Sequence, residues 1–181
     1  HGRAGVSRYL VGSVAEKVVR LSSVPVLTVR MQADERLQFP YEDVLVPTDG
    51  SAVAAHAADH GLSLAAALDA TVHALSVVDD RALGRAVRSV RSGEDGTQAA
   101  NEAVDDLVSR AATQGVTDTV RHVVQGAPIT GILDTVDEND IDAVVMGTTG
   151  RRGTDRILLG SVAEKTVRAA PVPVVTVGDD G

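Results

Sequence analysis

One thirty-residue passage occurs twice in this chain. Residues 1–30 align without a gap to residues 149–178, and 18 of the 30 positions are identical. A match of this length indicates an internal duplication. The second copy closes a stretch of domain size, whereas the first copy stands alone at the start of the sequence. We therefore expect the C-terminal fragment of one domain (residues 1–30), a linker (residues 31–42) and one complete domain (residues 43–178).

Composition favours an α/β fold. Hydrophobic residues make up 44% of the chain, but aromatic residues make up only 2%. The core must therefore be built from Val, Ala, Leu and Ile, which is typical of parallel sheets buried beneath helices on both faces.

Charge and cysteine content exclude several functions. The formal net charge is -8, so the protein repels nucleic acid and anionic membranes. Cysteine is absent, which excludes disulfides, thiolate metal sites and a cysteine nucleophile, and fits a reducing cytoplasm. No apolar run approaches the roughly 18 residues that span a bilayer. We expect a cytoplasmic protein with no nucleic-acid or membrane partner.

From residue 43 onward, Val-rich runs alternate with helical patterns. The predicted strands are residues 43–48, 71–78, 119–124, 141–146 and 172–177. The predicted helices are residues 51–68, 97–114, a segment beginning at Pro128, and 161–170. The polar residues 79–96 predict a loop in which short helical turns are allowed. This order predicts an open parallel five-stranded sheet with helices on both faces. The first repeat copy adds a helix (residues 13–21) and a strand (residues 24–29).

Two glycine-rich stretches flank the loop after the fourth predicted strand. Gly147 and Gly150 stand at the start of the loop. Nine residues (151–159) then separate Gly150 from Gly160 and Ser161, where a helix is predicted to begin. Glycines let the backbone approach a ligand or take positive φ, and free N–H groups at a helix start attract anions. In open parallel sheets, ligands bind beyond the carboxyl ends of the strands. The pattern therefore predicts a phosphate cradle.

A second interpretation needs no ligand. Ser161 with Glu164, like Ser13 with Glu16, has the spacing of a helix capping box, and Gly147 fits a simple turn. Short glycine patterns are weak signals, so the residues alone support both interpretations equally.

The end of the first predicted strand carries Pro47, Thr48, Asp49, Gly50 and Ser51. An aspartate at this edge can accept hydrogen bonds from a ribose or from an adenine amino group. Alternatively, Asp49 or Ser51 caps the following helix, and without the glycine-rich loop this alternative is the favoured one.

Four motifs occur in order along the chain: Pro-Thr-Asp-Gly-Ser from residue 47, Gly-Ala-Pro from residue 126, Met-Gly-x2-Gly-x9-Gly-Ser from residue 146, and Pro-Val-Pro-Val-Val from residue 171. Together they resemble the universal stress protein family. The resemblance spans residues 43–178. It includes the G-x2-G-x9-G-[ST] signature of the family's ATP-binding branch.

This resemblance implies an ATP site. By position, Pro47, Thr48, Asp49 and Val77 would hold adenine and ribose, Met146 and Gly147 would lie along the nucleoside, and Gly150, Gly160, Ser161 and Val162 would surround the phosphates. The implied cofactor is ATP, with Mg or Mn as an optional companion ion and no metal ligand from the protein. One departure is Thr149, where the family often has His, as His1 does in the first copy.

The resemblance also implies a role for the first copy. The last strands of two family domains pair across a two-fold axis, in homodimers or between tandem domains. We expect Val24 to Val29 to pair antiparallel with Val172 to Val177 and so cover a sheet edge.

The remaining polar residues carry weaker signals. Arg151 and Arg152 either add charge beside the phosphates or are solvated loop residues, and the second interpretation is favoured. The histidines His56, His60, His73 and His122 show no metal-ligand spacing and are interpreted as structural or surface residues.

The resulting hypothesis is an ATP-binding stress protein that acts as a nucleotide-dependent sensor or regulator. No motif fixes a catalytic residue, although slow ATPase activity or autophosphorylation stays open. One alternative is an interaction or dimerisation module without a nucleotide. Another is an ATP-using adenylating enzyme, which is disfavoured because the first-strand loop lacks the S-G-G-x-D-S pattern of such enzymes.

Overall fold

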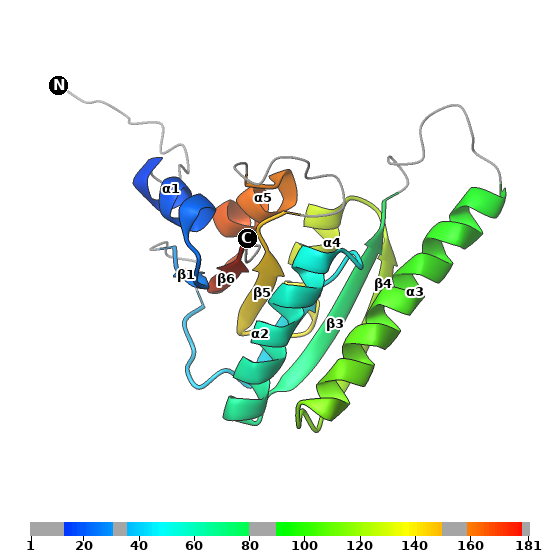
Figure 1. The fold of residues 1–181 in the computed structure, drawn as a ribbon, viewed down its shortest axis with the longest axis horizontal. Helices are drawn as coiled ribbons and strands as arrows, with labels where there is room; N and C mark the ends of the chain where they lie inside the picture. The colour runs from blue at the N-terminus through cyan, green and yellow to red at the C-terminus, as the bar shows by residue number, and fades with distance from the viewer. Residues whose placement is uncertain (1–12, 31–35, 80–89, 150–158, 179–181) are drawn as a thin grey trace.

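The computed structural model describes residues 13–30, 36–79, 90–149 and 159–178. Its strands are β1 (Val26–Thr28), β2 (Asp43–Pro47), β3 (Thr71–Val78), β4 (Thr119–Gln125), β5 (Ala143–Gly147) and β6 (Val174–Val177). Its helices are α1 (Ser13–Leu21), α2 (Ala52–Leu68), α3 (Val90–Thr113), α4 (Pro128–Glu138) and α5 (Ser161–Ala169). Figure 1 shows one twisted sheet with helices packed against both faces.

The six strands form one sheet in the order β1-β6-β5-β2-β3-β4. Strands β2 to β6 are parallel, which confirms the predicted α/β fold and its five-stranded parallel sheet. β1 adds a sixth strand at the edge, antiparallel to β6, with Leu27 opposite Val175. The predicted pairing of the two repeat copies is therefore confirmed, over the three central residues of the strand predicted from residue 24 to 29.

The hydrophobic core has two halves, one on each face of the sheet. One half packs α2 and α3 against the sheet, and the other packs α4 and α5. Small residues bring α2 close to the strands: a Cβ at Gly61 would lie 2.9 Å from Cγ2 of Val46. The aromatic-poor composition thus produces a core of closely spaced elements rather than one of large side chains.

One helix begins earlier than its sequence pattern predicts. Residues 79–96 were predicted to be a loop, but α3 already begins at Val90. The glycines and charged residues of this stretch indicated that no helix forms there. A helix needs an apolar stripe only where it packs against the core, so a first turn that projects from the sheet can be polar on all sides. Gly96 also suits close packing, because a Cβ there would lie 3.2 Å from Cγ1 of Val78. Within the described residues, no helix is both long enough and apolar enough to cross a membrane.

Candidate functional site

The sheet opens between β2 and β5 at their carboxyl ends. These two strands pair through Val44 with Ala143 and Leu45 with Val144. Beyond that point, the Thr48 N–H donates to the Leu75 carbonyl at 2.8 Å, on the β3 side, whereas the Thr148 N–H donates to the Val177 carbonyl at 2.9 Å, on the β6 side. From β2 the next strands, β3 and β4, are added on one side, whereas β5 and β6 are added on the other side of β2. The crevice between β2 and β5 therefore lies at the topological switch point, where open α/β sheets bind ligands.

The loop after β2 is held in a defined shape. The Thr48 hydroxyl accepts a hydrogen bond from the Gly50 N–H at 3.1 Å, and the Asp49 carboxylate accepts one from the Ser51 N–H at 3.0 Å. Gly50 has φ +75°, which favours glycine. The Ser51 hydroxyl accepts from the Ala54 N–H at 3.2 Å, so Ser51 is the N-cap of α2. Asp49 therefore shapes the loop and leaves the capping role to Ser51.

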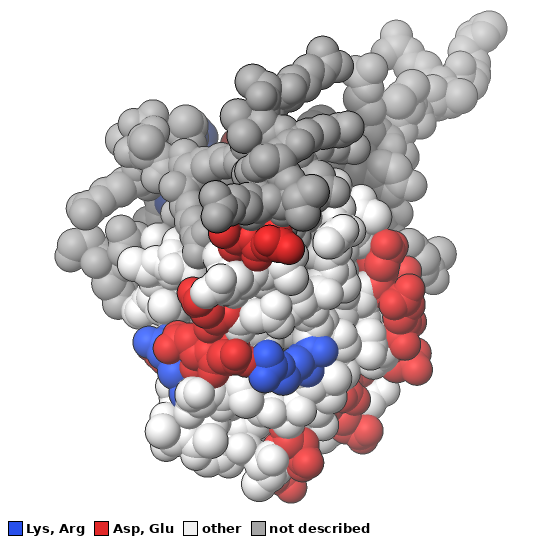
Figure 2. Space-filling model, turned by 90° about the vertical axis from the view of Figure 1, so that its right-hand side faces the viewer, with Lys and Arg blue, Asp and Glu red and all other residues white. Residues whose placement is uncertain are grey.

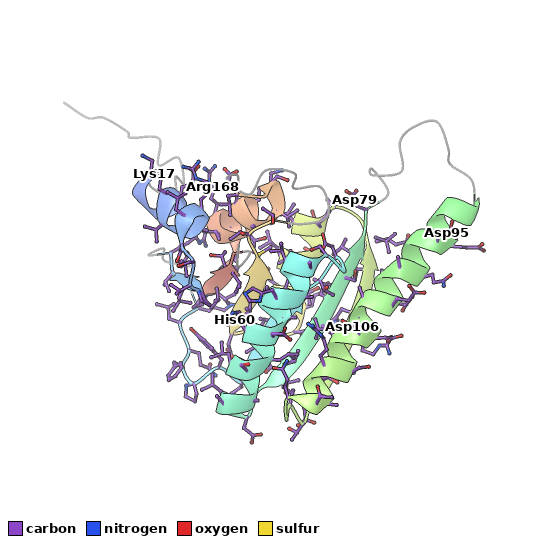
Figure 3. All side chains as sticks on the ribbon, viewed as in Figure 1. Lys17, His60, Asp79, Asp95, Asp106 and Arg168 are labelled. Atoms are coloured by element: carbon purple, nitrogen blue, oxygen red, sulfur yellow. The ribbon has the colours of Figure 1, made fainter. Side chains whose placement is uncertain are left out.

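Val77 reaches the crevice through its backbone. Its side chain packs against the α4 side of the sheet, where a Cβ at Gly131 would lie 2.9 Å from it. Every second residue of a strand directs its backbone N–H and C=O toward the same neighbouring strand. The Leu75 carbonyl accepts from Thr48 and so faces β2, and the N–H and C=O of Val77, two residues later, face the same side. The β2 and β3 pairing ends at Pro47 and Leu75, so these groups of Val77 lie beyond the end of β2. Asp79, which follows β3, marks the same edge in Figure 3.

Met146 and Gly147 have structural explanations. The Met146 side chain is buried in the α4 and α5 half of the core. A Cβ at Gly147 would lie 3.0 Å from Cγ1 of Val53, so glycine lets β5 approach the first turn of α2. Any contact of these two residues with a ligand must come from their backbone.

The predicted capping box at α5 is wrong. Gly160 is the N-cap, Ser161 is the first helical residue, and no side chain of the described residues caps this helix. Glu164, instead of reaching back, forms an ion pair with Arg168 at 2.8 Å. The alternative without a ligand therefore loses its main support, because no side chain in the described part of the chain accepts a hydrogen bond from the first N–H groups of α5.

Gly160 is a glycine for reasons of space. Its N–H donates to the Thr148 carbonyl at 2.7 Å, and a Cβ would lie 3.0 Å from that oxygen and 3.3 Å from the Thr149 Cα. Its φ of -61° is ordinary, so the expected positive φ is absent at this glycine. This contact fixes the start of α5 against the end of β5. Among the other predicted residues, Val162 is half-buried at the α5 core and Ser161 is exposed. Gly150, Arg151 and Arg152 lie outside the described residues.

A groove between α2 and α3 adjoins the first-strand loop and was not anticipated. Its volume is about 270 Å³, and Thr48 and Gly50 lie at one end. Four alanines of the two helices line it, together with Glu102, Asp106, Leu107 and Arg110 of α3. Arg110 crosses between the helices, donating to the Ala55 carbonyl at 2.8 Å. Figure 2 shows acidic side chains spread over this side of the molecule, with a few basic ones among them. The only sequence signal was the run of small residues.

Two histidines that looked scattered in the sequence are in direct contact. His73 Nε2 lies 2.9 Å from the Asp43 carboxylate, and His73 Nδ1 lies 3.0 Å from His122 Nε2. Burial, followed by the neighbouring His73, lowers the pKa of His122. The cluster joins β2, β3 and β4 on the α4 side of the sheet, away from the crevice. Within the described chain, no group of three or more potential ligands is arranged to hold a metal.

Comparisons with known proteins agree on one family. The family model described as "Universal stress protein family" matches residues 1–30 and 40–178. The universal stress protein MJ0531 of Methanocaldococcus jannaschii is 34% identical over 144 residues, which cover 76% of this chain and 82% of that protein.

Two solved structures are similar in fold and sequence. The universal stress protein UspA from Lactobacillus plantarum has a TM-score of 0.63 and 26% identity, covering 77% of this chain and 99% of that one. A universal stress protein solved in complex with cAMP has a TM-score of 0.61 and 27% identity, covering 76% and 97% of the two chains.

Proposed function

Because this chain belongs to the universal stress protein family, we propose that it binds ATP at the crevice between β2 and β5. The bound nucleotide makes the protein a sensor or regulator in the cytoplasmic stress response.

The observation that carries the proposal is the start of α5, which no side chain of the described residues caps, beside the switch-point crevice. Gly160 is bonded to Thr148, so the first turn of α5 is held at the carboxyl end of β5. Negative charge at a helix start is stabilised by roughly 0.3–1 kcal/mol, and backbone N–H groups there bind phosphate oxygens directly. A polyanionic ligand fits this arrangement better than a neutral one.

The opposite wall suits a nucleoside. Asp49 lies on the loop after β2, and the backbone groups of Val77 face the same gap. A carboxylate accepts from ribose hydroxyls, and a strand N–H with its C=O matches the donor and acceptor pattern of an adenine edge. We therefore assign Pro47, Thr48, Asp49 and Val77 to adenosine.

We assign the phosphates to the wall of the crevice that β5 and α5 form. We assign the backbone of Met146 and Gly147 to the path along the nucleoside, and Gly160, Ser161 and Val162 to the phosphates. Gly150 joins them on the strength of its place in the glycine signature. A divalent cation such as Mg or Mn would accompany ATP through its phosphates rather than through carboxylates of the protein.

The relatives support a purine nucleotide as the ligand class. One similar structure is titled as a complex with cAMP. Cyclic AMP shares adenine and ribose with ATP but carries a single phosphate. The two ligands therefore differ mainly in how many contacts they make with the start of α5.

A second candidate function is an assembly module that needs no nucleotide. The pairing of β1 with β6 favours it, because this pairing already uses the edge of the sheet for association. Adenylating chemistry stays the weaker alternative, since release of pyrophosphate would require a substrate and a dedicated loop.

The proposal is tested by measuring nucleotide binding directly. We expect purified protein to release ATP on denaturation, seen by mass spectrometry, or to bind added ATP in calorimetry more tightly than cAMP. Gly160→Arg should abolish binding by filling the space beside Thr148. The matched control is Gly12→Arg, the same substitution in the first repeat copy, which should leave binding intact.

Two outcomes decide against an ATP site. One is the absence of both retained and added nucleotide in a folded protein, which would favour the assembly module. The other is equal loss of binding in both glycine variants, which would mean that the second copy does not hold the phosphates.

A further inference from the structure

The groove between α2 and α3 is narrow and lined by small side chains. Its alanines are Ala55 and Ala58 of α2 and Ala99 and Ala103 of α3. Because both helices present small residues here, the space between them stays unfilled. At about 270 Å³ the groove is smaller than the roughly 300–1,000 Å³ of pockets that hold drug-sized ligands. It therefore suits one long side chain better than a whole small molecule.

The groove carries more negative than positive charge. Glu102 and Asp106 line it, and they stand four positions apart, so both face the same side of α3. In Figure 3, Asp106 lies on the side of α3 that faces α2. Arg110, the one basic residue among the described lining residues, is already engaged. Its guanidinium pairs with Asp59 at 3.2 Å and donates to the Ala55 carbonyl at 2.8 Å.

The two carboxylates also repel each other. Like charges four positions apart on a helix destabilise it. Arg110 Nε lies 3.7 Å from the Asp106 carboxylate, which is longer than a direct hydrogen bond. Glu102 accepts its hydrogen bond from a neutral group, the Gln98 amide, at 2.8 Å. A further cation beside both carboxylates would relieve this repulsion, so charge complementarity points to a positively charged occupant.

We propose that the groove between α2 and α3 docks a lysine side chain of a partner protein. The alkyl stem lies along the alanines and the ammonium lies beside Glu102 and Asp106, because lysine packs its methylenes on apolar surface while its charge stays in water. The net charge of -8 attracts a basic partner over distance. Figure 2 shows the acidic side chains of this side of the molecule.

A partner protein suits this groove better than a free amine. A free alkylamine loses its translational freedom for one solvent-exposed ion pair, which contributes little. A lysine carried by a partner shares that cost with the rest of the interface. The groove therefore recognises one basic side chain of a larger contact.

The same groove touches the nucleotide site proposed above. Thr48 and Gly50 line one end of it, and the Thr48 hydroxyl accepts from the Gly50 N–H at 3.1 Å. Arg110 reaches this region through Ala55, whose N–H donates to the Ser51 carbonyl at 2.9 Å. A docked ammonium adds positive charge near bound ATP, so docking and ATP binding strengthen each other reciprocally. This coupling rests on the proposed ATP site, whereas docking itself does not.

A peptide titration without nucleotide tests the docking. The probe is the acetylated peptide Ala-Ala-Lys-Ala-Ala, and the matched probe carries norleucine in place of lysine. Amide signals of the full chain are followed by NMR at low salt. We expect the lysine peptide to shift Gly50, Ala58 and Ala103, and the norleucine peptide to bind roughly fivefold more weakly, the ratio for one exposed ion pair. Added salt should weaken the lysine peptide.

Variants of the groove separate its shape from its charge. Ala103→Leu fills the groove without a change of charge, and Glu102→Gln removes one carboxylate with little change of shape. Each should weaken the lysine peptide roughly fivefold. The matched control is Asp134→Asn, an exposed carboxylate of α4 on the other face of the sheet, which should leave binding unchanged. Circular dichroism identifies the folded variants, and either folded groove variant decides.

The coupling to ATP is measured in a second titration with saturating ATP. We expect ATP to tighten the lysine peptide roughly fivefold, at the lower end of usual coupling between sites. An unchanged affinity in a chain that binds ATP would overturn the coupling. A chain that binds no ATP would remove the proposed ATP site and the coupling with it, and the titration without nucleotide would still decide the docking.

Three results would overturn the docking. The first is equal binding of the lysine and norleucine peptides. The second is a set of shifted signals that lies outside the groove. The third is binding of n-butylamine, which is the lysine side chain alone, as tightly as the lysine peptide, because the groove would then take a free amine and not a partner protein.

Discussion

The guanidinium of Arg30 donates a hydrogen bond to the carbonyl of Arg168 at 3.0 Å, across 138 positions of sequence. Arg30 ends the first repeat copy, and Arg168 lies in the last turn of α5 in the second. A cation at a helix C-terminus also meets the negative end of the helix dipole. This contact fastens the strand of one copy to the helix of the other, beside the β1 and β6 pairing.

Removing this contact should loosen β1 selectively. Arg30→Ala should increase hydrogen exchange in Val26–Thr28 and lower the free energy of unfolding of this edge by about 1 kcal/mol, the usual net value of one hydrogen bond. Exchange in β2 and β3 should not change. Arg121→Ala, which removes an exposed ion pair with Asp105, serves as the control. Equal exchange in Val26–Thr28 for both variants would contradict the role of Arg30.

Two serines at helix starts should respond differently to the same change. Ser51 caps α2 through its hydroxyl, whereas Ser161 is the first residue of α5 and makes no cap. Ser51→Ala should cost roughly 0.5–2 kcal/mol in the free energy of unfolding. Ser161→Ala should stay within about 0.5 kcal/mol of the original protein. Urea unfolding of both variants decides, and a larger loss for Ser161→Ala would reinstate the capping box.

Gly160→Ala should strain the junction between β5 and α5. The new Cβ would lie 3.0 Å from the Thr148 carbonyl oxygen, which is backbone and cannot rotate away. We expect a loss of roughly 1–3 kcal/mol in unfolding free energy, the range for overpacking. Gly115→Ala is an informative comparison, since its Cβ meets nothing within 4 Å and its cost comes from φ +84° alone. Rescue of the Gly160 variant by ATP would add support for the binding site.

Stability should fall in mild acid because of the histidine pair. The pKa of His122 is lowered by burial and then by His73, whose other nitrogen contacts the Asp43 carboxylate. Below the unfolded value of about 6.5, the unfolded chain binds a proton that the folded chain binds only at lower pH. The stabilising contribution is therefore complete above about pH 6.5 and is lost as pH falls through the lowered pKa.

Urea midpoints at a series of pH values check this prediction. His122→Gln keeps an N–H that can donate to His73 but cannot take up a proton, so its midpoint should depend less on pH below about 6.5. His60→Gln on α2 is the control, because His60 contacts His56 and not this pair. An unchanged slope in His122→Gln would show that other groups dominate acid unfolding.

Much of the fold could be predicted because it depends on local patterns. Val-rich runs between turn residues located β2 to β6, and the N-cap at Ser51 located the start of α2. The beginning of α3 was missed, since a helix turn that projects from the sheet leaves no apolar periodicity to detect. At the site, the sequence identified the glycines of the loop after β5, but it did not show why each position requires glycine. Gly147 and Gly160 are small because Val53 and Thr148 lie against them.

The sequence by itself determined the family motifs, the duplication and the order of strands and helices. Each of these follows from residues that are near one another in the chain. Only the tertiary structure decided which contacts those residues make. It shows that His73 meets Asp43 and His122, that α5 begins after Gly160 rather than at a capping Ser161, and that identical valines are buried in one copy and exposed in the other. The physical reason is that burial and strand pairing depend on residues distant in sequence that folding brings together, and the sequence of a single segment does not specify those residues.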